Sequence, residues 1–152
     1  MKTYAAKYME LIQQHAPEMA KRWAEDVRSN RKTTYYKFLD EQKIISQCIR
    51  FYEYFSRMFV DEKLSADVLK YFKTYARESY VMGIPMDEAV YALILMRRHI
   101  WLYAEFQTIF STEIGQQQAV DTLSRTILLF DYAVYEITRE YQELMKKQAI
   151  KK

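Results

Sequence analysis

Hydrophobic residues recur at steps of three and four positions along almost all of the 152-residue chain. This spacing places them on one face of an α-helix, so the pattern predicts a protein built from helices. The first two helices are expected at about residues 2–15 and 17–28, and a third follows a polar loop at 29–34 and ends near 61. The last three are expected at about 66–82, 86–110 and 116–152.

Two short segments mark the ends of predicted helices. Ser65 is placed to cap the fourth helix, because its hydroxyl can accept a hydrogen bond from an amide of the first turn. Gly83, Ile84 and Pro85 separate the fourth helix from the fifth. Glycine suits the left-handed position that follows a helix, and proline suits the first position of the next one. We therefore expect these two helices to meet at a tight corner.

The predicted last helix carries an apolar register over nearly four heptads, formed by Val120, Leu123, Ile127, Phe130, Val134, Ile137, Tyr141 and Leu144. Such a heptad seam is typical of a helix that pairs with another helix. The residues expected to form a dimer contact and to carry a signal along the helix are Leu123, Ile127, Phe130, Val134, Ile137 and Tyr141. The alternative is that the seam packs on the bundle of its own chain.

The composition supports one all-α domain over residues 1–152. Half of the residues are hydrophobic, and two glycines and two prolines supply little of the turn chemistry that a sheet needs. The net charge of +3 comes from interleaved charges, so nucleic acid is not an expected partner. The chain contains no run of about eighteen apolar residues, the length that a membrane-spanning helix would need. The single cysteine, Cys48, suits a reducing compartment, and we expect a cytoplasmic protein.

Residues able to carry catalysis are sparse. The chain has two histidines and one cysteine, and their spacing matches no zinc, calcium or di-iron motif. Two isolated glycines form no phosphate-binding loop. Cys48 and His99 could meet in a fold as a nucleophile and its base, but no local motif supports that pair. We therefore predict a protein that is not an enzyme and has no metal site.

His99 lies in the middle of the predicted fifth helix among apolar residues. An imidazole there could bind haem iron, although a histidine bonded to a carbonyl or a tyrosine is the simpler interpretation. His15 is expected at the end of the first helix, where the helix dipole favours it. Arg97, Arg98 and Trp101 lie on the remaining face of the fifth helix. If exposed, they would form a protein-binding hot spot, so a plain interaction module is an alternative function.

Several segments together resemble a known family of sensor domains. Trp23 lies in an early amphipathic helix, and Tyr35-Tyr36 precede the long third helix. Residues 80–85, Tyr-Val-Met-Gly-Ile-Pro, end the fourth helix, and residues 97–101, Arg-Arg-His-Ile-Trp, lie in the fifth. In this order they resemble, over most of the chain, the N-terminal domains of stressosome RsbR-type co-antagonists.

This resemblance implies a globin-like bundle of about six helices that binds no haem and forms a homodimer. It also implies a helical linker to an output domain, which in that family is a phosphorylatable anti-sigma-antagonist domain or a histidine kinase. The function implied is a non-catalytic sensory input domain of a bacterial signal-transduction protein. Its signal would pass through the C-terminal helix.

The corner at Gly83 also resembles that of globin-coupled sensors, in which a proximal histidine lies about one helical turn before the equivalent glycine. Here that position is Ser79. A serine hydroxyl is a poor iron ligand compared with imidazole, so we expect no haem cofactor. The alternative is a haem-based gas sensor in which His99, or Tyr80 if the register slips, binds the iron.

Overall fold

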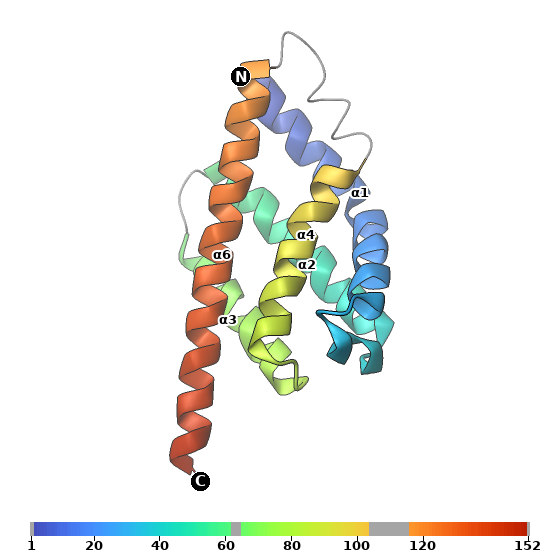
Figure 1. The fold of residues 1–152 in the computed structure, drawn as a ribbon. Helices are drawn as coiled ribbons and strands as arrows, with labels where there is room; N and C mark the ends of the chain where they lie inside the picture. The colour runs from blue at the N-terminus through green and yellow to red at the C-terminus, as the bar shows by residue number, and fades with distance from the viewer. Residues whose placement is uncertain (1, 62–64, 104–115, 152) are drawn as a thin grey trace.

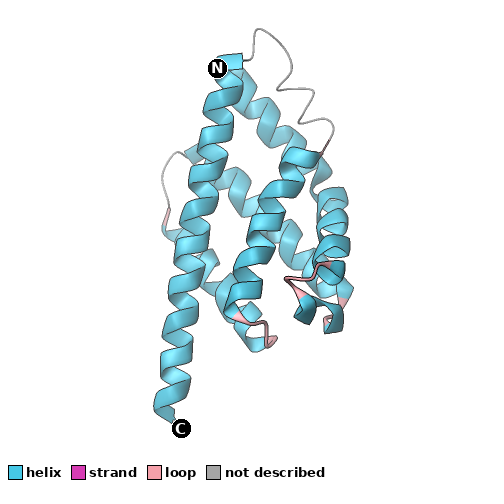
Figure 2. Ribbon diagram, viewed as in Figure 1, coloured by secondary structure: helices cyan, strands magenta, loops and turns pink. Residues whose placement is uncertain are grey.

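The computed structural model describes residues 2–61, 65–103 and 116–151, and every regular element in these ranges is a helix (Figure 2). In chain order the elements are α1 (Lys2–Ser29), the 3₁₀-helix η1 (Thr34–Phe38), α2 (Glu41–Asp61), α3 (Ala66–Val81), α4 (Met86–Leu102) and α6 (Gln116–Lys151). The predicted all-α fold with a long C-terminal helix is confirmed. The Ser65 cap is also confirmed, since its hydroxyl accepts a hydrogen bond from the Val68 amide at 3.2 Å.

The predicted number of helices is wrong, because the described residues form five α-helices rather than six. The chain was expected to break before Pro17, whereas α1 continues through it. A proline inside a helix removes one hydrogen bond and bends the helix, but packing on both sides can hold the two parts together. Ile12 and Ala16 before the proline and Met19 after it are buried in one core. Figure 1 shows α1 bending part-way along its length.

The helices form a bundle in which α4 lies between α1 and α6 (Figure 1). α1 also packs along α2, and α6 packs along α3. The C-terminal end of α6 extends past the other helices. The fifth predicted helix corresponds to α4, which ends at Leu102. Its expected continuation over residues 104–110 lies outside the described residues.

Aromatic side chains fill much of the core. The ring centre of Phe51 in α2 lies 5.5 Å from that of Phe130 in α6 and 5.6 Å from that of Tyr75 in α3. Large rings of this kind bury extensive apolar surface and gain further stabilisation from edge and offset contacts. Phe51 therefore joins three helices at one point.

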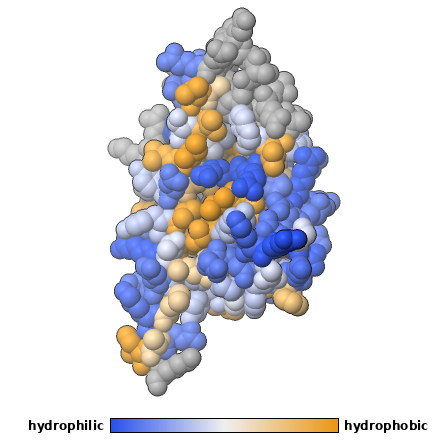
Figure 3. All heavy atoms as spheres, in the orientation of Figure 1, coloured by the Kyte–Doolittle hydropathy of each residue, from blue (hydrophilic) through white to orange (hydrophobic). Residues whose placement is uncertain are grey.

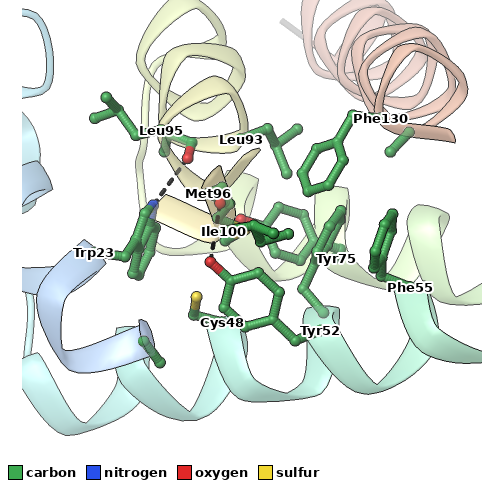
Figure 4. Packing of buried hydrophobic residues seen from close by; sticks show 14 of the residues in the cluster. Trp23, Cys48, Tyr52, Phe55, Tyr75, Leu93, Leu95, Met96, Ile100 and Phe130 are labelled. Carbon is green, nitrogen blue, oxygen red and sulfur yellow. Dashed lines mark hydrogen bonds between the residues drawn. The ribbon is translucent and has the colours of Figure 1, made fainter. Parts of the chain in front are cut away.

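Two hydrogen bonds hold α4 from the side of α1 and α2. The indole N–H of Trp23 donates to the Ala92 carbonyl at 2.8 Å, and the Tyr52 hydroxyl donates to the Met96 carbonyl at 3.0 Å. Figure 4 shows both side chains reaching toward α4 across the core. Because all four residues are buried, these bonds also satisfy polar groups that would otherwise be costly to bury.

The predicted corner between α3 and α4 is confirmed. Gly83 has a φ angle of +85°, in the left-handed region that glycine adopts most readily. The Ile84 amide donates to the Ser79 carbonyl at 3.1 Å, and the Gly83 amide donates to the Tyr80 carbonyl at 3.0 Å. This pair of bonds is the Schellman motif that ends many helices. It fixes the direction in which the chain enters α4.

Candidate functional site

The heptad seam predicted on the last helix divides into two parts. Val120, Leu123 and Ile127 are 61%, 38% and 41% exposed. The later members are buried or half-buried on their own bundle: Phe130, Val134, Ile137, Tyr141 and Leu144. Phe130, Ile137 and Tyr141 therefore pack within their own chain instead of forming the expected dimer contact. Only the first part of the seam is available to a partner.

The period of the helix explains this division. A heptad repeat advances 3.5 residues per turn and a straight α-helix 3.6, so a heptad stripe drifts by about 20° per heptad around the helix. Over the length of the seam the drift reaches roughly 60–70°. Along Val120, Ile127 and Tyr141, which are spaced by multiples of seven residues, the stripe therefore turns from the flank of α6 toward the bundle.

The first half of α6 faces the bundle with small and polar side chains. Ala119, Thr122 and Thr126 are buried, and the first large buried side chain in the described part of α6 is Leu129, next to Phe130. The Thr126 hydroxyl donates to the Thr122 carbonyl at 2.8 Å and lies 2.8 Å from the Tyr8 hydroxyl of α1. The pattern of large apolar residues does not reveal this face, because alanine and threonine are less hydrophobic than the leucines on the opposite side of the helix. Their recurrence at helical spacing is the signal that could have found it.

Large apolar side chains on the other side of this half remain exposed. Three of them share one side of the helix at steps of three and four residues, and we call these the outer stripe: Val120, Leu123 and Ile127. Figure 3 shows hydrophobic residues gathered along α6 and toward α4. Single exposed apolar residues are ordinary, but a contiguous apolar patch is typical of a binding surface.

A groove of about 400 Å³ continues the outer stripe toward α4. Its lining residues come from α1, α4 and α6: Tyr8, Ile94, Arg97, Arg98, Ile100, Trp101, Leu123, Thr126 and Ile127. Most of these side chains are apolar, and the two arginines supply the charge. The groove and the outer stripe share Leu123 and Ile127, so they form one surface.

Arg97, Arg98 and Trp101 all lie at this groove, so the structure brings the three predicted hot-spot residues together. Trp101 is 43% exposed. The Arg97 guanidinium lies 3.9 Å from the Asp131 carboxylate of α6. An ion pair between two such partly exposed groups contributes at most about 1 kcal/mol. It links α4 to α6 without adding much stability.

His99 connects α4 to α1. Its Nε2 atom lies 2.8 Å from a carboxylate oxygen of Asp26, and the Asn30 side-chain amide donates to Asp26 at 3.3 Å. The partner is therefore a carboxylate rather than the carbonyl or tyrosine that we expected. One of the two ring nitrogens that could bind iron is engaged with α1 in this arrangement.

His15 does not lie at a helix end, because α1 continues beyond it to Ser29. Its Nδ1 atom lies 3.1 Å from the Tyr103 hydroxyl, which donates to a carboxylate oxygen of Glu18 at 2.8 Å. The predicted role at a helix C-terminus is therefore wrong. His15 instead takes part in a polar cluster that joins α1 to the end of α4.

Tyr80 and Ser79, the positions compared with a proximal haem histidine, both have partners within the bundle. The Tyr80 hydroxyl donates to the Gln148 side chain, and its ring packs against Tyr141 with centroids 5.8 Å apart. Ser79 is buried, and its hydroxyl accepts a hydrogen bond from the Gln47 amide at 3.2 Å. These contacts connect α2, α3 and the second half of α6.

Cys48 is fully buried in α2, and burial raises the pKa of its thiol well above the usual range. A thiol that stays protonated is a weak nucleophile. Burial likewise raises the pKa of five tyrosines, Tyr36, Tyr52, Tyr71, Tyr75 and Tyr141. Their hydroxyls therefore stay neutral well above physiological pH.

Within the described residues, no group of three or more histidine, cysteine, aspartate or glutamate side chains could hold a metal ion. No helix in the same ranges combines the length and the apolar character needed to cross a bilayer. No known family model, curated protein or solved structure matches this chain. The resemblance to RsbR-type sensor domains therefore stays a prediction.

Proposed function

We propose that this chain is a non-catalytic sensory or regulatory input domain of a signal-transduction protein. It pairs with a second copy of itself and passes a conformational change through α6 to an output domain. One observation supports this most directly: α6 presents Leu123 and Ile127 to solvent while it packs on its own bundle with Thr122 and Thr126.

This orientation is unfavourable for a chain that remains alone. Full burial of a leucine or isoleucine side chain stabilises a protein by about 1.5–3 kcal/mol. Leu123 and Ile127 obtain only part of that gain in the monomer. A second copy that covers the outer stripe would supply the rest. The stripe and the groove together extend over α6 and α4, which suits an interface of about 800 Å² on each partner.

The end of α6 supports a role in transmission. Beyond Tyr141 the described side chains are exposed except for Leu144, which is half-buried. Because a continuous helix moves as a rigid element, a shift of α6 against α4 would also move this free end. A stimulus that favours one packing of these helices would shift the population of the paired α6 ends.

The hydrogen bonds of the two histidines support a non-catalytic role. The bond between His99 and Asp26 and the cluster of His15, Tyr103 and Glu18 both join α1 to α4. In these places the histidines hold elements of the fold together. A haem-based sensor has less support, since Nε2 of His99 is bonded to Asp26.

The pairing is tested by light scattering of the purified chain. We expect a dimer at concentrations on the order of tens of micromolar, as for an interface of standard size and moderate affinity. Ile127→Asp places a charge in the outer stripe and should convert the dimer to a monomer, because an unpaired buried charge is costly.

Val81→Asp is the matched control, since Val81 is an equally apolar residue at the end of α3 and is 84% exposed. It should leave the dimer intact. A wild-type monomer that is unchanged by Ile127→Asp would contradict self-pairing. In that case the groove with Arg97, Arg98 and Trp101 would favour the second candidate, a module that binds a different protein.

A further inference from the structure

Tyr141 is the last buried residue along the described part of α6, and it lies against the corner between α3 and α4. Its hydroxyl donates a hydrogen bond to the Ile84 carbonyl at 2.9 Å. Ile84 lies between the two helices, so its carbonyl is not committed to a helical hydrogen bond. This bond joins the C-terminal helix directly to the corner.

Side chains of two further helices reach the same point. Ser79 of α3 lies near the Tyr141 hydroxyl, and the Gln47 amide of α2 donates to the Ser79 hydroxyl at 3.2 Å. Tyr141 and Ser79 are both at most 1% exposed. Buried polar groups must keep their partners, because an unpaired one costs free energy. The rotation of α6 at Tyr141 is therefore restricted.

The corner itself has little freedom. Gly83 holds a φ angle of +85°, and a Cβ atom at this position would collide with the Tyr35 hydroxyl. That hydroxyl donates to the Met82 carbonyl at 3.0 Å. The Tyr35 amide donates to a carboxylate oxygen of Glu88 at 2.8 Å. A change in this corner would move the Ile84 carbonyl and hence the acceptor of the Tyr141 bond.

Beyond Tyr141, one more contact extends along α6. Tyr80 packs its ring on Tyr141 and donates its hydroxyl to Gln148. The other described side chains after Tyr141 are exposed or, at Leu144, half-buried. Near this end of α6, Tyr141 joins the helix to the corner and Tyr80 joins it to α3 through hydrogen bonds.

We propose that Tyr141 is the coupling residue that ties the orientation of residues 142–151 to the conformation of the Gly83 corner. The inference rests on the proposed function in one respect, that a signal leaves the bundle through α6. It adds the point at which the bundle and the outgoing helix are connected.

Tyr141→Phe tests this coupling, because it removes the hydroxyl and keeps the ring. Spin labels on Lys147→Cys in α6 and Glu53→Cys in α2 report the distance between the free end and the bundle. Both positions are exposed, whereas Cys48 is buried and should not be labelled. We expect one narrow distance distribution in the parent protein and a broader one in Tyr141→Phe. Amide exchange over 142–151 should rise roughly fivefold when one buried hydrogen bond is lost.

Tyr135→Phe is the matched control, since it removes an exposed tyrosine hydroxyl from the same helix. It should change neither the distance distribution nor the exchange rates. If Tyr141→Phe gives the same distribution and exchange as the parent protein, the proposal is wrong. Circular dichroism shows whether each variant keeps its helices.

A second substitution tests whether Tyr141 transmits a change in the Gly83 corner to α6 or only stabilises the position of α6. Gly83→Ala disturbs the corner and should shift the distance to the α6 label when Tyr141 is present. In the Tyr141→Phe background the same change should have little further effect. Equal shifts in both backgrounds would overturn the proposal. Tyr35→Phe, which removes the bond to the Met82 carbonyl, serves the same purpose if Gly83→Ala does not fold.

These measurements do not depend on pairing, because labelled chains diluted with unlabelled ones report distances within one chain. A monomer in light scattering would overturn the proposed dimer and leave the coupling result valid. Conversely, an intact dimer with an unchanged Tyr141→Phe distance would overturn the coupling alone.

Discussion

The two halves of α6 pack on the same bundle with different kinds of side chain. In the first half, Thr122 and Thr126 face inward while Leu123 and Ile127 are exposed. In the second half, from Phe130 onward, the side chains that face the bundle are large, and Phe130, Ile137 and Tyr141 are buried. The second half therefore has the usual arrangement of a surface helix, and the first half has the reverse.

This difference separates two kinds of packing within one helix. Buried aromatic contacts of the second half hold α6 on the bundle. In the first half, polar contacts such as that between Thr126 and Tyr8 position the helix, and its large apolar residues remain exposed. If this comparison is right, equivalent substitutions in the two halves should differ in their effect on stability.

High pH should have the largest effect, because the second half of α6 is anchored in a core that contains buried tyrosines. Burial raises the pKa of these tyrosines above the usual 10.0: Tyr36, Tyr52, Tyr71, Tyr75 and Tyr141. Above pH 10 the unfolded chain releases these protons and the folded chain keeps them. Stability should then fall by up to about 1.4 kcal/mol per pH unit for each such tyrosine.

Circular dichroism and tyrosinate absorbance measure this together. We expect the buried tyrosines to ionise only as the helices unfold cooperatively above pH 10, with stability unaffected by these groups below that pH. Ionisation of all fourteen tyrosines near pH 10 with the helices intact would show that these hydroxyls are not buried as described.

Phe130→Ala should have the next largest effect. Its ring centre lies 5.1 Å from that of Phe55 and 5.5 Å from that of Phe51, so its loss leaves a cavity between α2 and α6. We expect the free energy of unfolding to fall by about 3–5 kcal/mol, measured by urea denaturation. A loss below about 1 kcal/mol would mean that the second half of α6 is not anchored in the core.

Leu123→Ala should have the smallest effect on the stability of the monomer. The Leu123 side chain is already 38% exposed, so we expect a change below about 1 kcal/mol when the chain is dilute enough to be unpaired. Leu129→Ala is the matched control, since Leu129 is a buried leucine on the same helix. It should cost about 2–5 kcal/mol. Equal losses for the two leucines would remove the distinction between the faces of α6.

Local signals predicted much of the fold correctly. The Ser65 cap and the Gly83 corner depend on hydrogen bonds within a few residues, and both occur where the residue types favoured them. In α4, Leu93, Met96 and Ile100 recur at steps of three and four residues and are also buried. In these places the periodic pattern and the tertiary packing favour the same face.

Predictions failed where distant contacts outweighed a local preference. Pro17 favours the start of a helix, but packing of residues on both sides keeps α1 continuous. His15 consequently lies inside α1 and bonds to Tyr103, a residue far away in the sequence. Neither the hydrogen-bond partner of His15 nor the continuity of α1 through Pro17 could be predicted from the spacing of residues along α1.

The candidate site was predicted in part. Leu123, Ile127 and the group of Arg97, Arg98 and Trp101 do lie on one surface. Phe130 and the later seam residues do not, because the heptad stripe drifts around a straight helix until it meets the bundle. The burial of Ala119, Thr122 and Thr126 was not predicted, since their apolar signal is weak.

By itself, the sequence determined the helical class, the ends of several helices and the corner at Gly83. Each of these depends on interactions between residues only a few positions apart. The tertiary structure decided which of two competing faces of α6 is buried, and it carried α1 through Pro17. Those outcomes depend on contacts between distant segments, such as Tyr8 with Thr126 and Tyr141 with Ile84, whose combined packing energy outweighs local preference.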